Sequence, residues 1–379
     1  MTRLTRRMML GALGATAITS PLQVAYADGA QDRKLVFIIL RGALDGLAAL
    51  IPDDRELSDL RQATLPTKSE RLQLHNGFSL HPSLTSLHQL YQDGEAGFVH
   101  AAATPYRDRS HFDGQDELET LGDVSTRDGW LNRAVRVLAG SGLAVGYSLP
   151  LALRGSGAAS NWSPPVFTDA SEDLLDRLQD LYAEQPVLLE PLTMARATSI
   201  EDVSMGRTRP GAANQYSAAS KALGQLMRAE NGPNIGMLSF DGWDTHANQA
   251  GPFAARLRGL DAALLDLKSE LGSDWSKTTV IACSEFGRTA AENGSRGTDH
   301  GTGGLMILAG GAVRGGQVFG DWPGLKPRHL YEGRDLAPAN DITAALKGVL
   351  RDHLGVSSAV LNAEVFPGTS QFMSGLVRA

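Results

Sequence analysis

The sequence predicts an α/β fold, in which a mainly parallel central sheet carries helices on both of its faces. Continuous apolar runs rich in β-branched residues recur along the chain, and amphipathic segments lie between them. Strands that are buried on both faces show such runs, because neither side of the sheet meets water. Strands that alternate with helices along a chain favour a parallel sheet.

Five apolar runs are predicted to be buried strands. The first, at residues 34–40, reads Lys-Leu-Val-Phe-Ile-Ile-Leu and shows the pattern most clearly. The five strands are expected at residues 34–40, 96–103, 234–240, 277–284 and 304–309.

Helices are predicted where apolar residues recur every three or four positions. The clearest case begins at Phe253 and places a leucine on the same face up to Leu271. Residues 140–165 are rich in Gly, Ser and Pro, so we expect loop insertions with short strands around 140–215. The helices are expected at residues 81–93, from Ser110 onward, and at 216–230, 253–271 and 341–354.

The composition is that of an ordinary globular protein, with 42% hydrophobic and 20% charged residues in a chain of 379. The formal net charge of −7 disfavours a nucleic-acid partner, because proteins that bind nucleic acids are more often basic. The sequence has one cysteine, Cys283, which therefore cannot form an intramolecular disulfide. Its apolar neighbours predict a buried packing role.

Residues 1–27 are predicted to be an export signal. They contain the pair Arg6-Arg7, a short stretch rich in Gly and Ala, and an Ala-Tyr-Ala end at 25–27. Paired arginines indicate the twin-arginine export machinery as a partner, and the alternative is an ordinary secretory signal with an incidental arginine pair. We expect residues 28–379 to form a single domain with no membrane span, which is periplasmic or secreted.

Acidic and histidine residues follow the predicted strands. In open α/β sheets, ligands bind at the carboxyl ends of the strands, so side chains at these positions are candidates for a common site. The candidates are Asp45 after the first strand; Arg107, Arg109, Ser110, His111 and Asp113 after the second; Asp241, Asp244 and His246 after the third; Glu285 after the fourth; and Asp299 and His300 before the fifth.

Carboxylates and imidazoles in this combination predict a divalent metal site. They suit zinc, manganese, magnesium or calcium, depending on the ratio of oxygen to nitrogen ligands. No cysteine lies among them, which excludes a thiolate zinc site. Two metals about 4 Å apart could polarise a phosphoryl or sulfuryl oxygen and activate a nucleophile, and the candidates are numerous enough to hold both.

Five short motifs resemble a bacterial family known as domain of unknown function 1501. The resemblance runs from about Lys34 to the last helix, and that family is grouped with the alkaline phosphatases, sulfatases and cofactor-independent phosphoglycerate mutases. It implies an alkaline-phosphatase-like fold. The motifs are Leu-Arg-Gly-Ala-Leu-Asp-Gly at 40–46, Arg-Ser-His-Phe-Asp-Gly-Gln-Asp at 109–116, Asp-Thr-His at 244–246, Ser-Glu-Phe-Gly-Arg-Thr at 284–289, and Gly-Thr-Asp-His-Gly at 297–301.

The resemblance implies roles for most of the candidates. Ser110 matches a nucleophile at a helix N-terminus, and the alternative for Ser110 is a helix N-cap. Apart from the resemblance, Arg109, like Arg107, is a candidate to bind an anionic substrate, and the alternative is a solvated side chain. Glu285 stands where the wider group has an Asp followed by a His, so the second metal lacks one expected ligand. The expected metal ligands are Asp45, Asp241 or Asp244, His246, Glu285, Asp299 and His300, with His111 as a replacement.

These observations predict an exported, metal-dependent hydrolase of phosphate or sulfate esters, with a small-molecule or polymer ester as substrate. The alternative is a non-catalytic, metal-stabilised binding or assembly factor of the cell envelope. In a further alternative, Glu285 pairs with Arg288 and does not bind metal.

Overall fold

The computed structural model of the protein describes residues 32–122, 126–163, 178–179, 181–183, 185–197 and 212–378. The predicted export signal at 1–27 lies outside the described residues. Within the described part of the chain, no helix is both long and apolar enough to cross a membrane.

A nine-stranded sheet forms the centre of the described structure, in the order β11-β5-β10-β9-β1-β8-β6-β7, with β12 paired to β5. All five predicted strands are present within a residue or two of their expected bounds. The strands are β1 (Lys34–Arg41), β5 (Ala96–Ala103), β6 (Gly142–Val145), β7 (Ala159–Trp162), β8 (Ile235–Asp241), β9 (Thr278–Cys283), β10 (Gly304–Ala309), β11 (Gln317–Phe319) and β12 (Asn340–Asp341).

The sheet is parallel except for β10, which runs antiparallel to its neighbours β5 and β9. The prediction of a mainly parallel sheet is therefore confirmed. Since β10 is reversed, it begins at the edge of the sheet where its neighbours end. Residues just before β10 consequently lie at the same edge as residues that follow β1, β5, β8 and β9.

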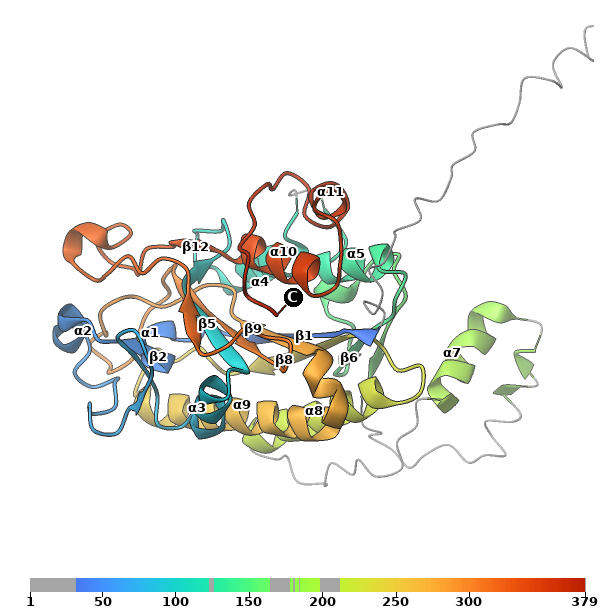
Figure 1. Ribbon diagram of the computed structural model, residues 1–379, viewed down its shortest axis with the longest axis horizontal. Helices are drawn as coiled ribbons and strands as arrows, with labels where there is room; N and C mark the ends of the chain where they lie inside the picture. The colour runs from blue at the N-terminus through green and yellow to red at the C-terminus, as the bar shows by residue number, and fades with distance from the viewer. Residues whose placement is uncertain are drawn as a thin grey trace, which may run out of the picture.

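Helices cover both faces of this sheet, as the sequence predicted (Figure 1). On one face lie α3 (Thr85–Gln92), α8 (Ala212–Arg228) and α9 (Ala250–Leu271). The other face is covered by α4 (His111–Thr120), α5 (Trp130–Val137) and α10 (Ile342–Asp352). Successive side chains of β1 point to opposite faces, and each face contributes to its own core. Val36, Ile38 and Leu40 pack beneath α3, α8 and α9, whereas Leu35, Phe37 and Ile39 pack beneath α4, α5 and α10.

The long helix α9 follows the predicted leucine pattern. Leu257, Leu260 and Leu264 are fully or almost fully buried against the sheet, and burial of each such side chain contributes about 1.5–3 kcal/mol. The helix ends at Gly272, whose φ of 55° lies in the left-handed region that glycine adopts at little cost. Cys283 is buried in β9, in agreement with its predicted packing role.

The shorter elements lie around this framework. β6 and β7 join the edge of the sheet, so the insertion region does contain the short strands expected there. A second, three-stranded sheet has the order β2-β4-β3, and the sequence did not predict it. The remaining elements are β2 (Leu50–Pro52), β3 (Leu72–Gln73), β4 (Phe78–Leu80), α1 (Gly46–Ala49), α2 (Arg55–Leu60), α7 (Pro186–Ala197), α11 (Ser358–Val360), the 3-10 helices Leu151–Leu153, Gly272–Lys277 and Pro327–His329, and the π-helix Leu361–Val365.

Candidate metal centre

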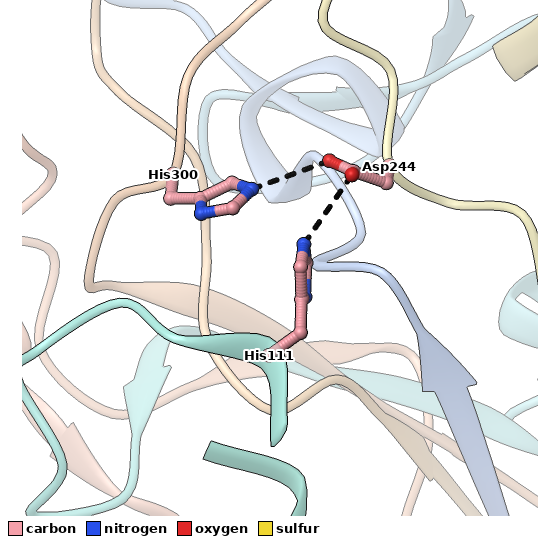
Figure 2. A group of neighbouring side chains, drawn as sticks. All are labelled: His111, Asp244 and His300. Atoms are coloured by element: carbon pink, nitrogen blue, oxygen red, sulfur yellow. Dashed lines mark hydrogen bonds and ion pairs between the residues drawn. The ribbon is translucent and has the colours of Figure 1, made fainter. Parts of the chain in front are cut away.

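Three histidines and one aspartate meet at the carboxyl edge of the central sheet. His111 is the first residue of α4, Asp244 and His246 lie in the loop between β8 and α9, and His300 lies in the loop before β10. Figure 2 shows His111, Asp244 and His300 turned toward one another. One ligand atom from each of these three residues lies within 4.8 Å of the others. The reversed direction of β10 is what brings His300 to this edge.

The nitrogen and oxygen atoms of this group are spaced like the ligands of one small cation. Nε2 of His246 and Nε2 of His300 lie 3.0 and 3.3 Å from Oδ1 of Asp244. Nε2 of His111 lies 3.4 Å from Oδ2 of the same carboxylate. Ligands about 2.0–2.1 Å from a tetrahedral zinc ion are about 3.3 Å apart, so the group matches this spacing.

Each of the three histidines uses Nδ1 to reach an oxygen outside the group. Carboxylate and carbonyl oxygens only accept hydrogen bonds, so Nδ1 carries the proton in each ring and Nε2 carries the lone pair. Metal-binding histidines usually have this arrangement. The pairs are His111 with Oε1 of Glu285 at 2.7 Å, His246 with Oδ1 of Asp299 at 3.2 Å, and His300 with the backbone carbonyl of Arg109 at 2.9 Å.

The closest contact in the group joins two such lone pairs. Nε2 of His246 and Nε2 of His300 are 2.9 Å apart, and neither has a proton to share when both rings are neutral. Nε2 of His111 is buried and has no hydrogen-bond partner among the described residues. A shared proton would satisfy two of these nitrogens, whereas a metal ion would satisfy all three together with Asp244. The residues present therefore fit a divalent cation.

Glu285 lies behind His111 and does not face the other histidines, contrary to its predicted role as a ligand. The residue is fully buried. Its carboxylate accepts hydrogen bonds from His111, from the backbone N–H of Gly42 at 2.9 Å, from Gln115 at 3.1 Å and from the hydroxyl of Ser284 at 2.9 Å. Burial raises the pKa of Glu285, but the hydrogen bonds from His111 and Gln115 lower it by more, so the carboxylate is ionised. The hydrogen bond to Glu285 in turn raises the pKa of His111.

Asp45 is also not brought into the group, because other side chains occupy its carboxylate. Arg61 donates to both oxygens, at 2.6 and 3.2 Å, and Gln249 donates at 2.5 Å. The backbone N–H of Ala48 adds a hydrogen bond of 3.3 Å that caps α1. Burial raises the pKa of Asp45, but the Arg61 guanidinium outweighs it and lowers the pKa overall. Asp45 therefore forms a buried ion pair.

Arg288 holds the aspartate of the group. Its side chain is fully buried, and Nη2 donates to Oδ1 of Asp244 at 2.6 Å. Burial raises the pKa of Asp244, and this hydrogen bond lowers it by more, so Asp244 is ionised. The alternative in which Arg288 pairs with Glu285 is thus not observed. The other N–H groups of Arg288 donate to backbone carbonyls, namely those of Gly42, Ala43, Trp243 and Thr298.

Ser110 occupies the N-cap position of α4, but its side chain makes no capping hydrogen bond. The residue is half-buried, and no hydrogen bond of its hydroxyl is found within the described structure. Both chain neighbours belong to the group, since the carbonyl of Arg109 binds His300 and the ring of His111 points into it. The side chain of Ser110 therefore does not cap the helix, and its hydroxyl has no partner among the described residues.

The guanidinium of Arg109 is not directed to this group. It donates to Asp335 at 2.9 Å and to Glu332 at 2.6 Å, so two carboxylates already neutralise it. What Arg109 supplies is its carbonyl, and its backbone has a φ of 60°, which is uncommon for a residue other than glycine. Asp241 ends β8 with an exposed side chain, and no contact among the described residues joins its carboxylate to the histidines.

Asp299 contributes indirectly, as the acceptor for His246. Asn293 also donates to it, at 3.0 Å, and this hydrogen bond is the main cause of the lowered pKa of Asp299. Sequence reasoning did not identify Arg61, Gln249 or Gln115. Arg61 and Gln249 lie in no recognisable motif, and they reach Asp45 across 16 and 204 positions of the chain.

Comparison with known proteins adds a family and weak structural likenesses. Residues 67–361 match the family described as "Protein of unknown function (DUF1501)". No curated protein sequence matches the chain.

Among solved structures, the chain is similar to the C-terminal periplasmic domain of EcEptC from Escherichia coli in complex with Zn, with 9% identity, a TM-score of 0.38 and 76% of each chain covered. A second similar structure is the lipoteichoic acid synthase LtaP from Listeria monocytogenes, with 8% identity, a TM-score of 0.39, and 93% of this chain and 78% of that chain covered. A third is the alkaline phosphatase from the Antarctic bacterium TAB5, with 14% identity, a TM-score of 0.34, and coverage of 73% and 90%. Likeness at this level is too weak to support an activity.

Proposed function

The chain belongs to the family of proteins of unknown function DUF1501, so we propose its function from the geometry of the site. We propose that the protein is a metal-dependent hydrolase of phosphate or sulfate esters. The observation that carries the proposal is the convergence of three imidazole Nε2 atoms on the ionised carboxylate of Asp244. Lone pairs that face each other in this way favour a cation between them. A built cation site beside an unengaged serine hydroxyl suits ester hydrolysis.

His111, Asp244 and His300 would hold the cation, and His246 would complete the set from the solvent side, where its side chain is 44% exposed. When bound, a divalent cation supplies Lewis-acid polarisation of an ester oxygen and stabilises charge that develops there. Three nitrogens and one carboxylate oxygen favour zinc over calcium or magnesium, which prefer oxygen ligands. We therefore propose zinc as the metal.

Ser110 would act as the nucleophile. Its hydroxyl lies at the N-terminus of α4, where the first backbone N–H groups have no partner inside the helix. These N–H groups and the helix dipole favour an anion, so they would orient the phosphate or sulfate and stabilise the alkoxide form of the serine. After loss of its proton to solvent, the oxygen of Ser110 would attack phosphorus or sulfur, and the bond to the ester oxygen would break, so that the alcohol leaves with a proton from solvent. Water would then attack the ester formed on Ser110, which releases phosphate or sulfate and restores the serine hydroxyl.

The predicted export signal supports a periplasmic or secreted location for this activity, reached by the twin-arginine route. That route carries folded proteins, so the cation could be loaded before export. A fusion of residues 1–27 to a reporter protein that folds in the cytoplasm tests the route. Export of the reporter that disappears when Arg6 and Arg7 are both replaced by lysine is the expected result.

A substrate screen of the purified protein tests the proposed activity. The protein is incubated with zinc, manganese, magnesium or calcium and with aryl phosphates, phosphodiesters and aryl sulfates. We expect turnover with at least one pair, which is lost in Asp244→Asn and in Ser110→Ala. Metal binding without turnover of any of these esters would overturn the hydrolase and favour the alternative of a metal-stabilised binding factor.

A further inference from the structure

The carboxylate of Asp45 is already paired with a positive charge, the guanidinium of Arg61. Arg61 donates to both of its oxygens, and the two side chains are 0–1% exposed. We infer that the centre takes one divalent cation and not two, and that the Asp45–Arg61 ion pair stands in place of a second metal. The inference rests on the proposed function, since it concerns the same centre.

Asp45 has no lone pair available for a metal ion. Arg61, Gln249 and the backbone N–H of Ala48 together direct four hydrogen bonds at its two oxygens. A metal would have to displace the guanidinium, which would leave a buried and unpaired positive charge. Removal of one partner from a buried ion pair is strongly unfavourable. The geometry therefore excludes Asp45 as a ligand while Arg61 is present.

The other predicted ligands do not supply a second set. Glu285 and Asp299 are acceptors for the Nδ1 protons of His111 and His246, and they stabilise the orientation of those rings. Within the described residues, the remaining candidate Asp241 is exposed and not in contact with the group. Among the residues that the structure describes, one set of converging ligand atoms remains, and it contains the single carboxylate of Asp244.

Charge leads to the same conclusion. Arg61 and Arg288 are both buried, and each is in contact with one carboxylate, Asp45 or Asp244. The carboxylates of Glu285 and Asp299 add two negative charges beside His111 and His246, so one divalent cation at the histidines would bring this set of groups to neutrality. A second divalent cation would have to lie near two fixed guanidinium groups with no further carboxylate of this set to neutralise it, and like charges repel each other.

The ion pair also performs the positioning role that a shared metal would otherwise have. Gln249 donates to Asp45 and accepts hydrogen bonds from Thr245 at 3.0 Å and Thr298 at 2.7 Å. Thr245 lies between Asp244 and His246, and Thr298 lies two residues before His300. Asp45 thus anchors both ligand-bearing loops through one glutamine side chain, with no need for a metal between them.

Metal counting tests the inference. The purified full-length mature chain is titrated with Co²⁺ and with Zn²⁺, and the number of tightly bound ions per chain is determined by native mass spectrometry. The visible absorption of Co²⁺ reports when the site is filled. We expect saturation at one equivalent in the wild type and none in Asp244→Asn. Asp45→Asn should also bind one.

Asp45→Asn could fail to fold because it leaves Arg61 unpaired, so the double variant Asp45→Leu with Arg61→Met removes both charges together. We expect it to bind one ion as well. Two tightly bound ions in the wild type, with one lost in either Asp45 variant, would overturn the inference and leave the proposed function standing. No bound ion in the wild type would overturn the proposed function and the inference with it. One bound ion without turnover of any ester would support the inference and overturn only the hydrolase.

Discussion

Nδ1 of His111 lies 2.7 Å from Oε1 of Glu285, while the other nitrogen of the same ring is buried and has no hydrogen-bond partner in the part of the chain that the structure describes. The carboxylate fixes both the tautomer and the orientation of the ring, so that its lone pair points at Asp244. Glu285 therefore shapes the centre from behind a histidine, although the sequence predicted that it would bind the cation itself.

Replacement of Glu285 by Gln tests this role. The variant loses the charge that holds the Nδ1 proton, and the new amide has one acceptor oxygen for the several donors around it. Loss of such an outer partner typically weakens metal affinity by about 10–100-fold. We expect this loss for Zn²⁺ in a competition titration with a chromogenic chelator, with one ion still bound at saturation.

The matched control for this prediction is Glu332→Gln. Glu332 is also a carboxylate with a charged partner, Arg109, but its side chain is 57% exposed and lies outside the group. It should leave the affinity for Zn²⁺ unchanged. Equal affinities of the wild type and Glu285→Gln would show that His111 needs no support from Glu285.

Replacement of Ser110 by Ala separates catalysis from helix capping. Since the hydroxyl makes no capping hydrogen bond, we expect the free energy of unfolding to change by less than about 0.5 kcal/mol. Turnover should fall by roughly 10³-fold or more, as expected for loss of a nucleophile, while zinc affinity stays the same. Urea denaturation, hydrolysis of the best substrate and zinc titration measure the three quantities.

Ser357→Ala is the control, because Ser357 does cap its helix by accepting from the backbone N–H of Val360 at 3.3 Å. Loss of that cap should cost about 1 kcal/mol. If Ser110→Ala destabilises the protein as much as Ser357→Ala and retains turnover, Ser110 is a structural residue.

Replacement of Gln249 by Met tests the link between Asp45 and the ligand loops. The variant keeps the length of the side chain but removes one donor to Asp45 and the shared acceptor of Thr245 and Thr298. We expect a loss of about 1–3 kcal/mol in the free energy of unfolding and a weakening of zinc affinity by about tenfold. Urea denaturation measures the free energy of unfolding, and the titration with the chromogenic chelator measures the affinity for Zn²⁺.

The control variant Asn132→Leu removes a similar buried amide that donates to the carbonyls of Leu153 and Gly157, in a part of the chain that contributes no ligand. It should destabilise the protein without changing zinc affinity. A parallel loss of affinity in both variants would mean that general destabilisation, and not the loop anchor, weakens the centre.

The sequence predicted the framework because strands buried on both faces leave a continuous apolar run, as in β1 and β10. It could not give the direction of β10, since an apolar run has no polarity along the chain. The very short strands β11 and β12 leave too few residues for any pattern. The order of strands and helices predicted that the loops after β1, β5, β8 and β9 meet at the carboxyl edge, whereas the loop before β10 joins them only because β10 is reversed.

Which atoms of those loops face one another was not predictable. Asp45 and Asp244 are both aspartates after a strand, but Asp45 is fully buried whereas the side chain of Asp244 is 42% exposed, and their guanidinium partners lie differently. Arg61 binds both oxygens of Asp45, whereas Arg288 contacts Asp244 through one oxygen and leaves the other near His111. Arg288 lies 44 positions away along the chain from its partner. Such long-range choices depend on packing that a motif does not encode.

His100 provides a prediction about acid stability that does not involve the centre. It is fully buried, its Nδ1 accepts from the backbone N–H of Ala101 at 2.8 Å, and its Nε2 donates to the carbonyl of Leu50 at 2.9 Å. Burial lowers the pKa of His100 from 6.5 to about 4. The folded state therefore binds this proton less readily than the unfolded state does. The contribution of His100 to the free energy of unfolding is therefore greatest above about pH 6.5. It declines as the pH falls toward 4 and changes no further below that.

The size of this effect follows from the shift of the pKa, since each unit corresponds to about 1.4 kcal/mol, which gives about 3 kcal/mol in total for His100. In His100→Gln, the free energy of unfolding measured with urea should consequently fall by about 3 kcal/mol less between pH 7 and pH 4 than in the wild type. Leu87→Ala, which removes a buried side chain with no titratable group, should lower stability by a similar amount at every pH. An equally steep decline in His100→Gln and in the wild type would show that His100 is not the group that couples folding to acid. It would direct attention to two other buried histidines, His81 and His353, whose pKa values burial also lowers to about 4.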